Sequence, residues 1–220
     1  MRASMHDIAD EVAIRAGETS LAGVLHVPPD ALGVVAFAHG SGSSRHSPRN
    51  HRVAARLREA GFGTLLFDLL TEDEESDRHN VFDVELLASR LDAAREMLAT
   101  DPRARTLPVG YLGASTGAAA AIIAAAGRSR VRAVVSRGGR PDLAGAALDG
   151  DLPPTLLIVG ERDEDVLSLN RHAAQRMRGT VRLEVVTGAT HLFEEPGTLE
   201  QAADLAAAWF RRHVPPEGVS

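Results

Sequence analysis

The chain has 220 residues, 44% of them hydrophobic, and it contains no cysteine. This length and composition suit a single domain with a full apolar core, expected over residues 1–220. The lack of thiols excludes disulfides, a cysteine nucleophile and Cys-based zinc sites. The formal net charge is −6, and all 24 basic residues are arginine. An acidic chain is not expected to bind nucleic acid, and without lysine it cannot use a P-loop or Schiff-base lysine.

The sequence shows neither a secretory signal nor a membrane span. Residues 1–10 lack the uninterrupted apolar segment of a signal peptide. No window of about 18 residues is continuously apolar. We therefore expect a cytoplasmic protein with no membrane partner.

Apolar patterns predict four strands and one helix before residue 70. Alternation at the start of the chain indicates an antiparallel pair with a turn at residues 16–18. Continuous apolar runs then indicate buried strands on either side of a helix with apolar residues at helical spacing. The strands are expected at residues 11–15, 21–27, 33–38 and 62–67, and the helix at 49–60. The acidic patch at residues 71–77 is expected to be a solvated loop.

The rest of the chain alternates between helices and strands. Strands are expected at residues 107–112, 131–136, 156–159 and 181–186, and helices at 82–99, 118–126, 166–177 and 199–213. The Pro/Gly tail at residues 215–218 is expected to be frayed. This alternation predicts an α/β fold with a mostly parallel sheet of about seven to eight strands, helices on both faces and no large lid.

A serine, Ser115, lies at the centre of a Gly-Ala-Ser-Thr-Gly turn between a predicted strand and an alanine-rich helix. Such a turn forces strained backbone angles on the serine, and side chains at Gly113 or Gly117 would collide with the adjoining strand and helix. The turn places the hydroxyl at the carboxyl edge of the sheet, beside a helix N-terminus. The motif therefore predicts Ser115 as a nucleophile.

A serine hydroxyl needs a general base and a group that orients the base. Asp163 and His191 each follow a predicted buried strand, so both are expected at the same sheet edge as Ser115. In this interpretation His191 takes the proton from Ser115, and Asp163 holds the imidazole tautomer. Asp165 is the alternative acid, although it better suits the cap of the helix that follows.

Oxyanion donors are expected from backbone N–H groups near Ser115. The strand at residues 33–38 ends in a Gly/Ser turn whose amides no side chain obstructs. One donor is expected from Ser41 or Gly40, and the other from Thr116, the residue after the nucleophile.

Several cationic side chains follow the same strand ends. They suggest a carboxylate- or phosphate-bearing ligand, and the candidates for substrate binding are Gly40, Arg45, His46, Arg137 and Arg140. The segment with Arg45 and His46, which also holds Arg49 and Asn50, fits an anion pocket and a solvated helix start equally well. Neither a nucleotide-binding glycine motif nor a metal-binding histidine pair occurs, so we expect no cofactor and no metal.

These motifs, in this order, resemble those of α/β-hydrolases of the dienelactone hydrolase-like group. The resemblance covers nearly the whole chain and rests on residues 39–42, 113–117, 160–166 and 188–191. Residues 37–50 and 190–197 also resemble small bacterial hydrolases, some of which are fused to phosphoribosyltransferase domains. Dienelactone hydrolases use a cysteine nucleophile, whereas this chain has Ser115. The resemblance therefore implies an α/β-hydrolase fold and a serine-dependent esterase.

The expected function is hydrolysis of a small soluble carboxylic ester through an acyl-enzyme. Thioester hydrolysis or acyl transfer at the same residues is an alternative, and so is a binding or regulatory protein that keeps the fold without catalysis. Nothing in the sequence selects an oligomeric state, although a dimer is common in such folds.

Overall fold

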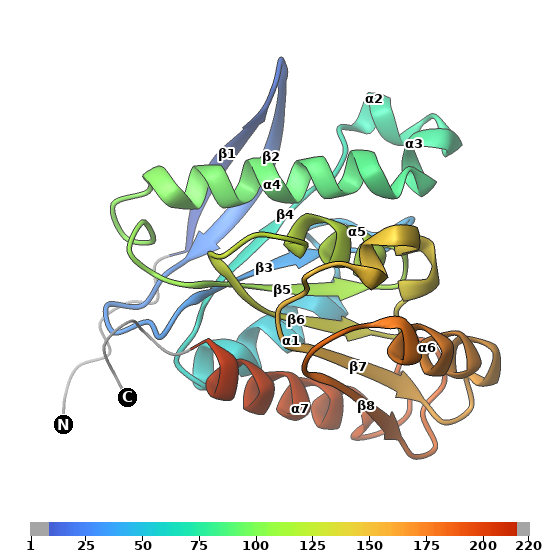
Figure 1. The fold of residues 1–220 in the computed structure, drawn as a ribbon. Helices are drawn as coiled ribbons and strands as arrows, with labels where there is room; N and C mark the ends of the chain where they lie inside the picture. The colour runs from blue at the N-terminus through green and yellow to red at the C-terminus, as the bar shows by residue number, and fades with distance from the viewer. Residues whose placement is uncertain (1–8, 215–220) are drawn as a thin grey trace, which may run out of the picture.

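Eight strands form one central sheet in the computed structural model, which describes residues 9–214. The strands are β1 (Ala9–Ala16), β2 (Thr19–His26), β3 (Val34–Ala38), β4 (Gly63–Phe67), β5 (Val109–Ala114), β6 (Val131–Arg137), β7 (Thr155–Gly160) and β8 (Val181–Val186). Their spatial order is β1-β2-β4-β3-β5-β6-β7-β8 (Figure 1). β2 pairs antiparallel with β1 and β4, and all other neighbours are parallel. The prediction of a mostly parallel sheet is confirmed.

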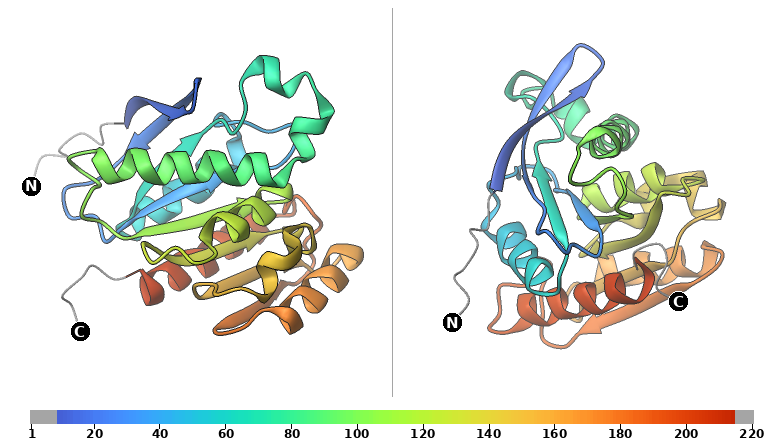
Figure 2. Two further views of the ribbon diagram at one scale, coloured as in Figure 1. Left: turned by 45° about the horizontal axis from the view of Figure 1, so that its top comes forward. Right: turned by 90° about the vertical axis from the view of Figure 1, so that its left-hand side faces the viewer.

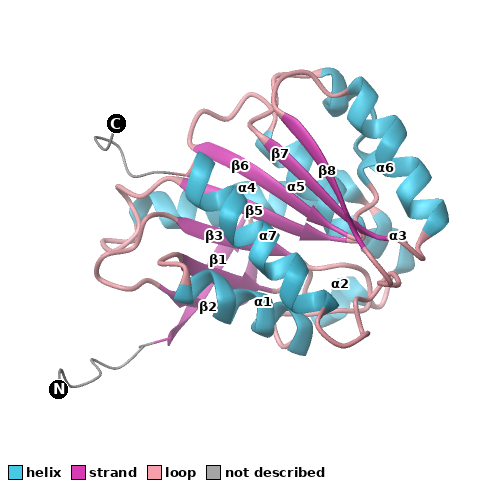
Figure 3. Cartoon of the chain, turned by 90° about the horizontal axis from the view of Figure 1, so that it is seen from below, coloured by secondary structure: helices cyan, strands magenta, loops and turns pink. Residues whose placement is uncertain are grey.

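Helices cover both faces of the sheet (Figure 2). They are α1 (Pro48–Glu59), α2 (Glu72–Glu75), α3 (Arg78–Phe82), α4 (Val84–Thr100), α5 (Thr116–Ala125), α6 (Glu164–Arg176) and α7 (Thr198–His213), with a 3-10 helix η1 (Pro141–Asp149). α1 and α7 lie on the face seen in Figure 3, and α4, α5 and α6 lie on the other. The carboxyl ends of β3, β5, β6, β7 and β8 therefore share one edge, as the alternating pattern predicts.

Two apolar cores, one on each face, hold the layers together. The core under α1 and α7 contains the aromatic side chains of Phe37, Phe62 and Phe210. The core under α4 and α5 is rich in alanine, valine and leucine, and four consecutive alanines of α5, residues 118–121, are fully buried. Because these side chains are small, α5 lies close to the sheet, and the turn that precedes it is packed firmly against β3.

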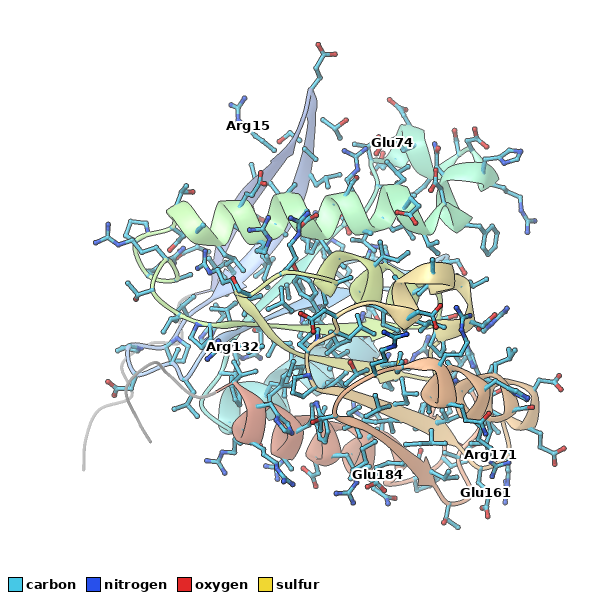
Figure 4. All side chains as sticks on the ribbon, in the orientation of Figure 1. Arg15, Glu74, Arg132, Glu161, Arg171 and Glu184 are labelled. Atoms are coloured by element: carbon cyan, nitrogen blue, oxygen red, sulfur yellow. The ribbon has the colours of Figure 1, made fainter. Side chains whose placement is uncertain are left out.

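The acidic patch at residues 71–77 is not the plain solvated loop that its charge predicts. Thr71 caps α2: its Oγ1 accepts the Glu74 N–H at 3.2 Å, and the Glu74 carboxylate accepts the Thr71 N–H at 2.9 Å. Figure 4 labels Glu74, whose other carboxylate oxygen, Oε1, accepts a hydrogen bond from Nη2 of the buried Arg90 of α4 at 2.5 Å. The segment is ordered because local capping and a long-range ion pair act on the same glutamate.

Two other predictions concern the tail of the chain and membrane spans, and one short helix is not predicted from the sequence. The tail at residues 215–218 lies outside the described residues. Within residues 9–214, no helix has the length and apolarity needed to cross a membrane. The sequence does not predict η1, because Gly145, with a φ of +54°, interrupts any regular helical pattern there.

Candidate active site

Ser115 lies on a strained turn between β5 and α5. Its φ of 52° and ψ of −123° fall where residues other than glycine are rare. A Cβ at Gly113 would lie 2.4 Å from Ala118 Cα, and one at Gly117 would lie 2.2 Å from the Ala38 carbonyl oxygen. Both collisions would involve backbone atoms that cannot move aside. The prediction that both glycines are sterically required is confirmed.

A carboxylate holds the His191 ring. His191 Nδ1 lies 2.6 Å from Asp163 Oδ2, and the Asp163 side chain is 14% exposed. An ionised carboxylate only accepts hydrogen bonds, so the tautomer assigned from this contact carries its proton on Nδ1. His191 Nε2 then has a free lone pair, which a general base needs.

Asp165, the alternative acid, lies outside this contact. α6 begins at Glu164, earlier than predicted, and the residue at its N-cap position is Asp163 rather than Asp165. The Asp163 side chain makes no cap hydrogen bond, because it faces His191 instead. Asp165 is exposed in the first turn of α6. The expectation that Asp165 caps the helix is therefore wrong.

The loops after β7 and β8, which carry Asp163 and His191, are tied to each other. The Arg162 N–H donates to the Ala189 carbonyl at 2.9 Å, and Glu161 Oε2 accepts the Gly188 N–H at 2.8 Å. Glu161, labelled in Figure 4, is exposed, and nothing in the sequence predicts its bond to Gly188. These bonds fix the position of the two loops relative to each other, and so they hold the Asp163 carboxylate beside the His191 imidazole.

Ser115 and His191 line the same cavity, of about 240 Å³, at the carboxyl edge of the sheet. Gly40 and Ser41, from the loop after β3, form another part of its wall. Ser115 and His191 both lie within the described residues, and in this conformation the Ser115 hydroxyl does not form a hydrogen bond with the His191 ring. Catalytic contacts of this kind often tighten only when substrate binds.

The two predicted oxyanion donors lie beside Ser115. The Ser41 N–H donates to Thr116 Oγ1 at 3.2 Å. Thr116 begins α5, so its own N–H has no acceptor within the helix. A Cβ at Gly40 would lie 2.9 Å from Ser115 Cβ, which shows how closely this loop approaches Ser115. The sequence does not indicate that the Thr116 hydroxyl already engages the Ser41 amide.

His39, for which the sequence predicts no role, anchors the loop that carries Ser41. Its buried ring accepts the Leu69 N–H on Nε2 at 3.1 Å, and Nδ1 lies 3.1 Å from the Gly40 carbonyl oxygen. The ring therefore joins the ends of β3 and β4. The available signal was a histidine placed directly after a buried strand and before a glycine.

We expect the buried His39 to make the protein less stable in acid. Burial lowers the pKa of His39, so the folded protein keeps the ring neutral while the unfolded chain protonates it below the ordinary value of 6.5. The free energy of unfolding should therefore fall as the pH decreases below this value, by up to about 1.4 kcal/mol per pH unit. Urea unfolding over a pH series measures the slope. His39→Gln, which keeps an acceptor for Leu69, should flatten the slope, and an unchanged slope would refute the assignment.

Arg137 lines the cavity, as predicted, together with Arg49 and Asn50. Arg137 Nη2 donates to Asn50 Oδ1 at 3.1 Å. Burial, with a smaller effect from Arg49, lowers the pKa of Arg137 to about 10, so its guanidinium is still charged at neutral pH. The segment around Arg49 combines the two interpretations that the sequence left open, because it is a helix start that faces the cavity.

Arg45, His46 and Arg140 do not line the cavity, contrary to expectation. Arg45 pairs with Asp68 after β4, and Arg140 pairs with Asp142 at 2.7 Å. His46 is exposed before α1. A neighbouring carboxylate holds each guanidinium, and the spacing of the arginines along the chain does not reveal these partners. Within residues 9–214, no group of three or more His, Asp or Glu side chains is placed to hold a metal ion.

Comparison with known proteins agrees with this architecture. The model of the dienelactone hydrolase family matches residues 21–213. Two Mycobacterium tuberculosis proteins, both named "Putative phosphoribosyl transferase", are 62% identical over 206 residues. The match covers 93% of this chain and 46% of each relative, so the chain spans about half the length of these relatives.

Solved structures show the same fold. A dienelactone hydrolase from Anabaena variabilis has a TM-score of 0.92 and 50% identity, covering 95% of this chain and 100% of the other. Est1E from Butyrivibrio proteoclasticus, at 16% identity, has a TM-score of 0.77 over 92% of this chain and 98% of its own. The chain therefore belongs to the dienelactone hydrolase family and has the α/β-hydrolase fold of those hydrolases.

Proposed function

We propose that the protein is a serine hydrolase that cleaves a small carboxylic ester through an acyl-enzyme. The observation that carries the proposal is the 2.6 Å contact between His191 Nδ1 and Asp163, at the wall of the cavity that Ser115 also lines. An oriented imidazole beside an alcohol on a strained turn is the arrangement that activates a serine.

In the first step, Ser115 Oγ attacks the carbonyl carbon of the ester while His191 Nε2 takes the hydroxyl proton. The carbonyl oxygen becomes an oxyanion, which the N–H groups of Thr116 and Ser41 bind. The Ser41 N–H exchanges its bond to the Thr116 hydroxyl for one to the oxyanion. Asp163 stabilises the imidazolium and does not itself take the proton.

The intermediate then collapses by breaking the bond to the alcohol oxygen. His191 gives its proton to the departing alkoxide, and the acyl group stays on Ser115. A water molecule next loses a proton to His191 and attacks the acyl carbon. The bond between the acyl carbon and Ser115 Oγ then breaks, His191 returns its proton to Oγ, and the acid is released. Thioester hydrolysis and acyl transfer would use the same residues and differ only in the leaving group or the acceptor.

Labelling with a fluorophosphonate tests the proposal without knowledge of the substrate. Ser115 Oγ should displace fluoride from phosphorus, and mass spectrometry should find the adduct on the peptide that contains Ser115. His191→Ala should abolish labelling on the same timescale, because the hydroxyl loses its base. Folded protein that takes up no label would contradict the proposal and favour a binding or regulatory role. An acyl chain-length series of esters and thioesters then defines the leaving group.

A further inference from the structure

Arg137 carries a buried positive charge next to the candidate nucleophile. It is paired in the sheet with Ala114, the residue before Ser115, and it is 8% exposed. Nη2 donates to Asn50, whereas Nη1 is buried with no hydrogen-bond partner among the described residues. A buried guanidinium without a carboxylate destabilises a fold, so packing alone gives no reason for an arginine at this position.

The walls of the cavity do not compensate this charge. No Asp or Glu occurs among the described residues that line it, and a second guanidinium, that of Arg49, belongs to the lining. The carboxylate paired with Arg49 is that of Glu194, at 3.5 Å, and both side chains are exposed. Water therefore screens that pair. Among the described residues that line the cavity, the permanently charged side chains are the guanidiniums of Arg49 and Arg137.

The N-terminus of α1 faces the same cavity. Ser47 caps this helix of 12 residues by accepting the Asn50 N–H at 3.3 Å, and the first turn contains no acidic residue. Ser47 and Asn50 both line the cavity. Helix starts favour anions through their N–H groups and dipole. The dipole of α1 and the Arg137 guanidinium, which has no carboxylate partner, belong to two separate elements. Both favour an anionic ligand.

We propose that this part of the cavity binds the phosphate group of a phosphorylated ester substrate. The proposal rests on the hydrolase function proposed above, for which it names the substrate class. Two guanidiniums and a helix start match an anion with more than one charge. A phosphate monoester carries about −1.5 to −2 charges at neutral pH and offers three acceptor oxygens, whereas a carboxylate brings a single charge. A cavity of about 240 Å³ is below the usual size for drug-sized ligands, so the ester must be small.

Inorganic phosphate should bind the Ser115→Ala variant, in which no ester is turned over, in a calorimetric titration. Adding Arg137→Gln to this background removes the buried charge while keeping an amide donor for Asn50. This change should weaken phosphate binding about tenfold or more. Arg132→Gln is the matched control, because Arg132 lies on the same strand at the opposite edge of the sheet (Figure 4). It should leave the affinity for phosphate unchanged.

A second variant, Arg49→Glu, changes a side chain of the cavity wall that is 38% exposed and should also weaken phosphate binding, because it reverses a charge at the wall. A folded parent that binds no phosphate would overturn the proposal, and so would acetate that binds as tightly as phosphate. Because the titration needs no turnover, it fails independently of the labelling experiment. If phosphate does not bind but Ser115 is labelled, the proposed phosphate subsite is refuted and the proposed hydrolase function stands. If phosphate binds but Ser115 is not labelled, the anion site stands and Ser115 is refuted as the nucleophile.

Discussion

Replacing Ser115 with alanine is expected to reduce kcat for p-nitrophenyl acetate by about a million-fold, to the level that binding and oxyanion stabilisation alone supply. The substitution removes the atom that attacks the ester carbonyl carbon in the first step of the proposed mechanism. Serine and alanine both carry a Cβ at the strained φ of 52°, so the turn should keep its geometry. Circular dichroism and the unfolding midpoint should therefore match those of the parent protein.

Ser44→Ala is the matched control for this experiment. Ser44 belongs to the loop after β3, and its Oγ accepts the His46 N–H at 3.2 Å, but it does not line the cavity. Its loss should change kcat little. If Ser115→Ala and Ser44→Ala hydrolyse the ester at the same rate, the hydrolysis does not depend on Ser115, and another group must be the nucleophile.

The sequence predicts the positions of Ser115, Asp163 and His191 because each depends on a local pattern. A strand ends at a glycine-containing turn in all three cases, and the carboxyl ends of parallel strands share one edge of the sheet. The prediction that the strand before His191 is buried is wrong: β8 is the last strand of the sheet, and all of its residues except Val186 are half-exposed or exposed. The order of the elements already implies that Asp163 and His191 lie close together, and the structure gives the distance between Nδ1 and Oδ2 as 2.6 Å. The need for Gly113 is predictable for a similar reason, because its Cβ would collide with Ala118 in the same strand-turn-helix unit. A Cβ at Gly117 would instead collide with Ala38 of β3, which is distant in the sequence.

Side-chain partners are less predictable, because they come from distant parts of the chain. Arg45 lies in the loop after one predicted strand, and Arg137 comes directly after another. Arg45 pairs with Asp68, whereas Arg137 donates to Asn50 and has no carboxylate partner among the described residues. Nothing near either arginine in the sequence distinguishes them. The same holds for His39, whose ring bonds the backbone of Leu69. Charge patterns thus identify which residues are available at an edge, and packing decides which of them face the cavity.

The choice between Asp163 and Asp165 gives the second large effect. Asp163→Asn should lower kcat for the ester by about 10,000-fold. An asparagine can present its NH₂ group to His191 Nδ1, which favours the tautomer with the proton on Nε2 and leaves no lone pair to accept the Ser115 proton. Asp165→Asn should lower kcat by less than about threefold, because Asp165 is exposed and its charge acts only on the start of α6.

The two variants form a matched pair, since each removes one carboxylate from the N-terminal end of α6. Any general effect of charge on that helix should therefore appear in both, and the difference between them measures the contact with His191. Nitrogen NMR of the His191 ring should show the proton moving from Nδ1 to Nε2 in Asp163→Asn alone. If instead Asp165→Asn causes the larger loss, the acid that orients His191 during turnover is Asp165. The loop after β7 would then have to rearrange on binding substrate, which the bonds from Arg162 to Ala189 and from Gly188 to Glu161 oppose.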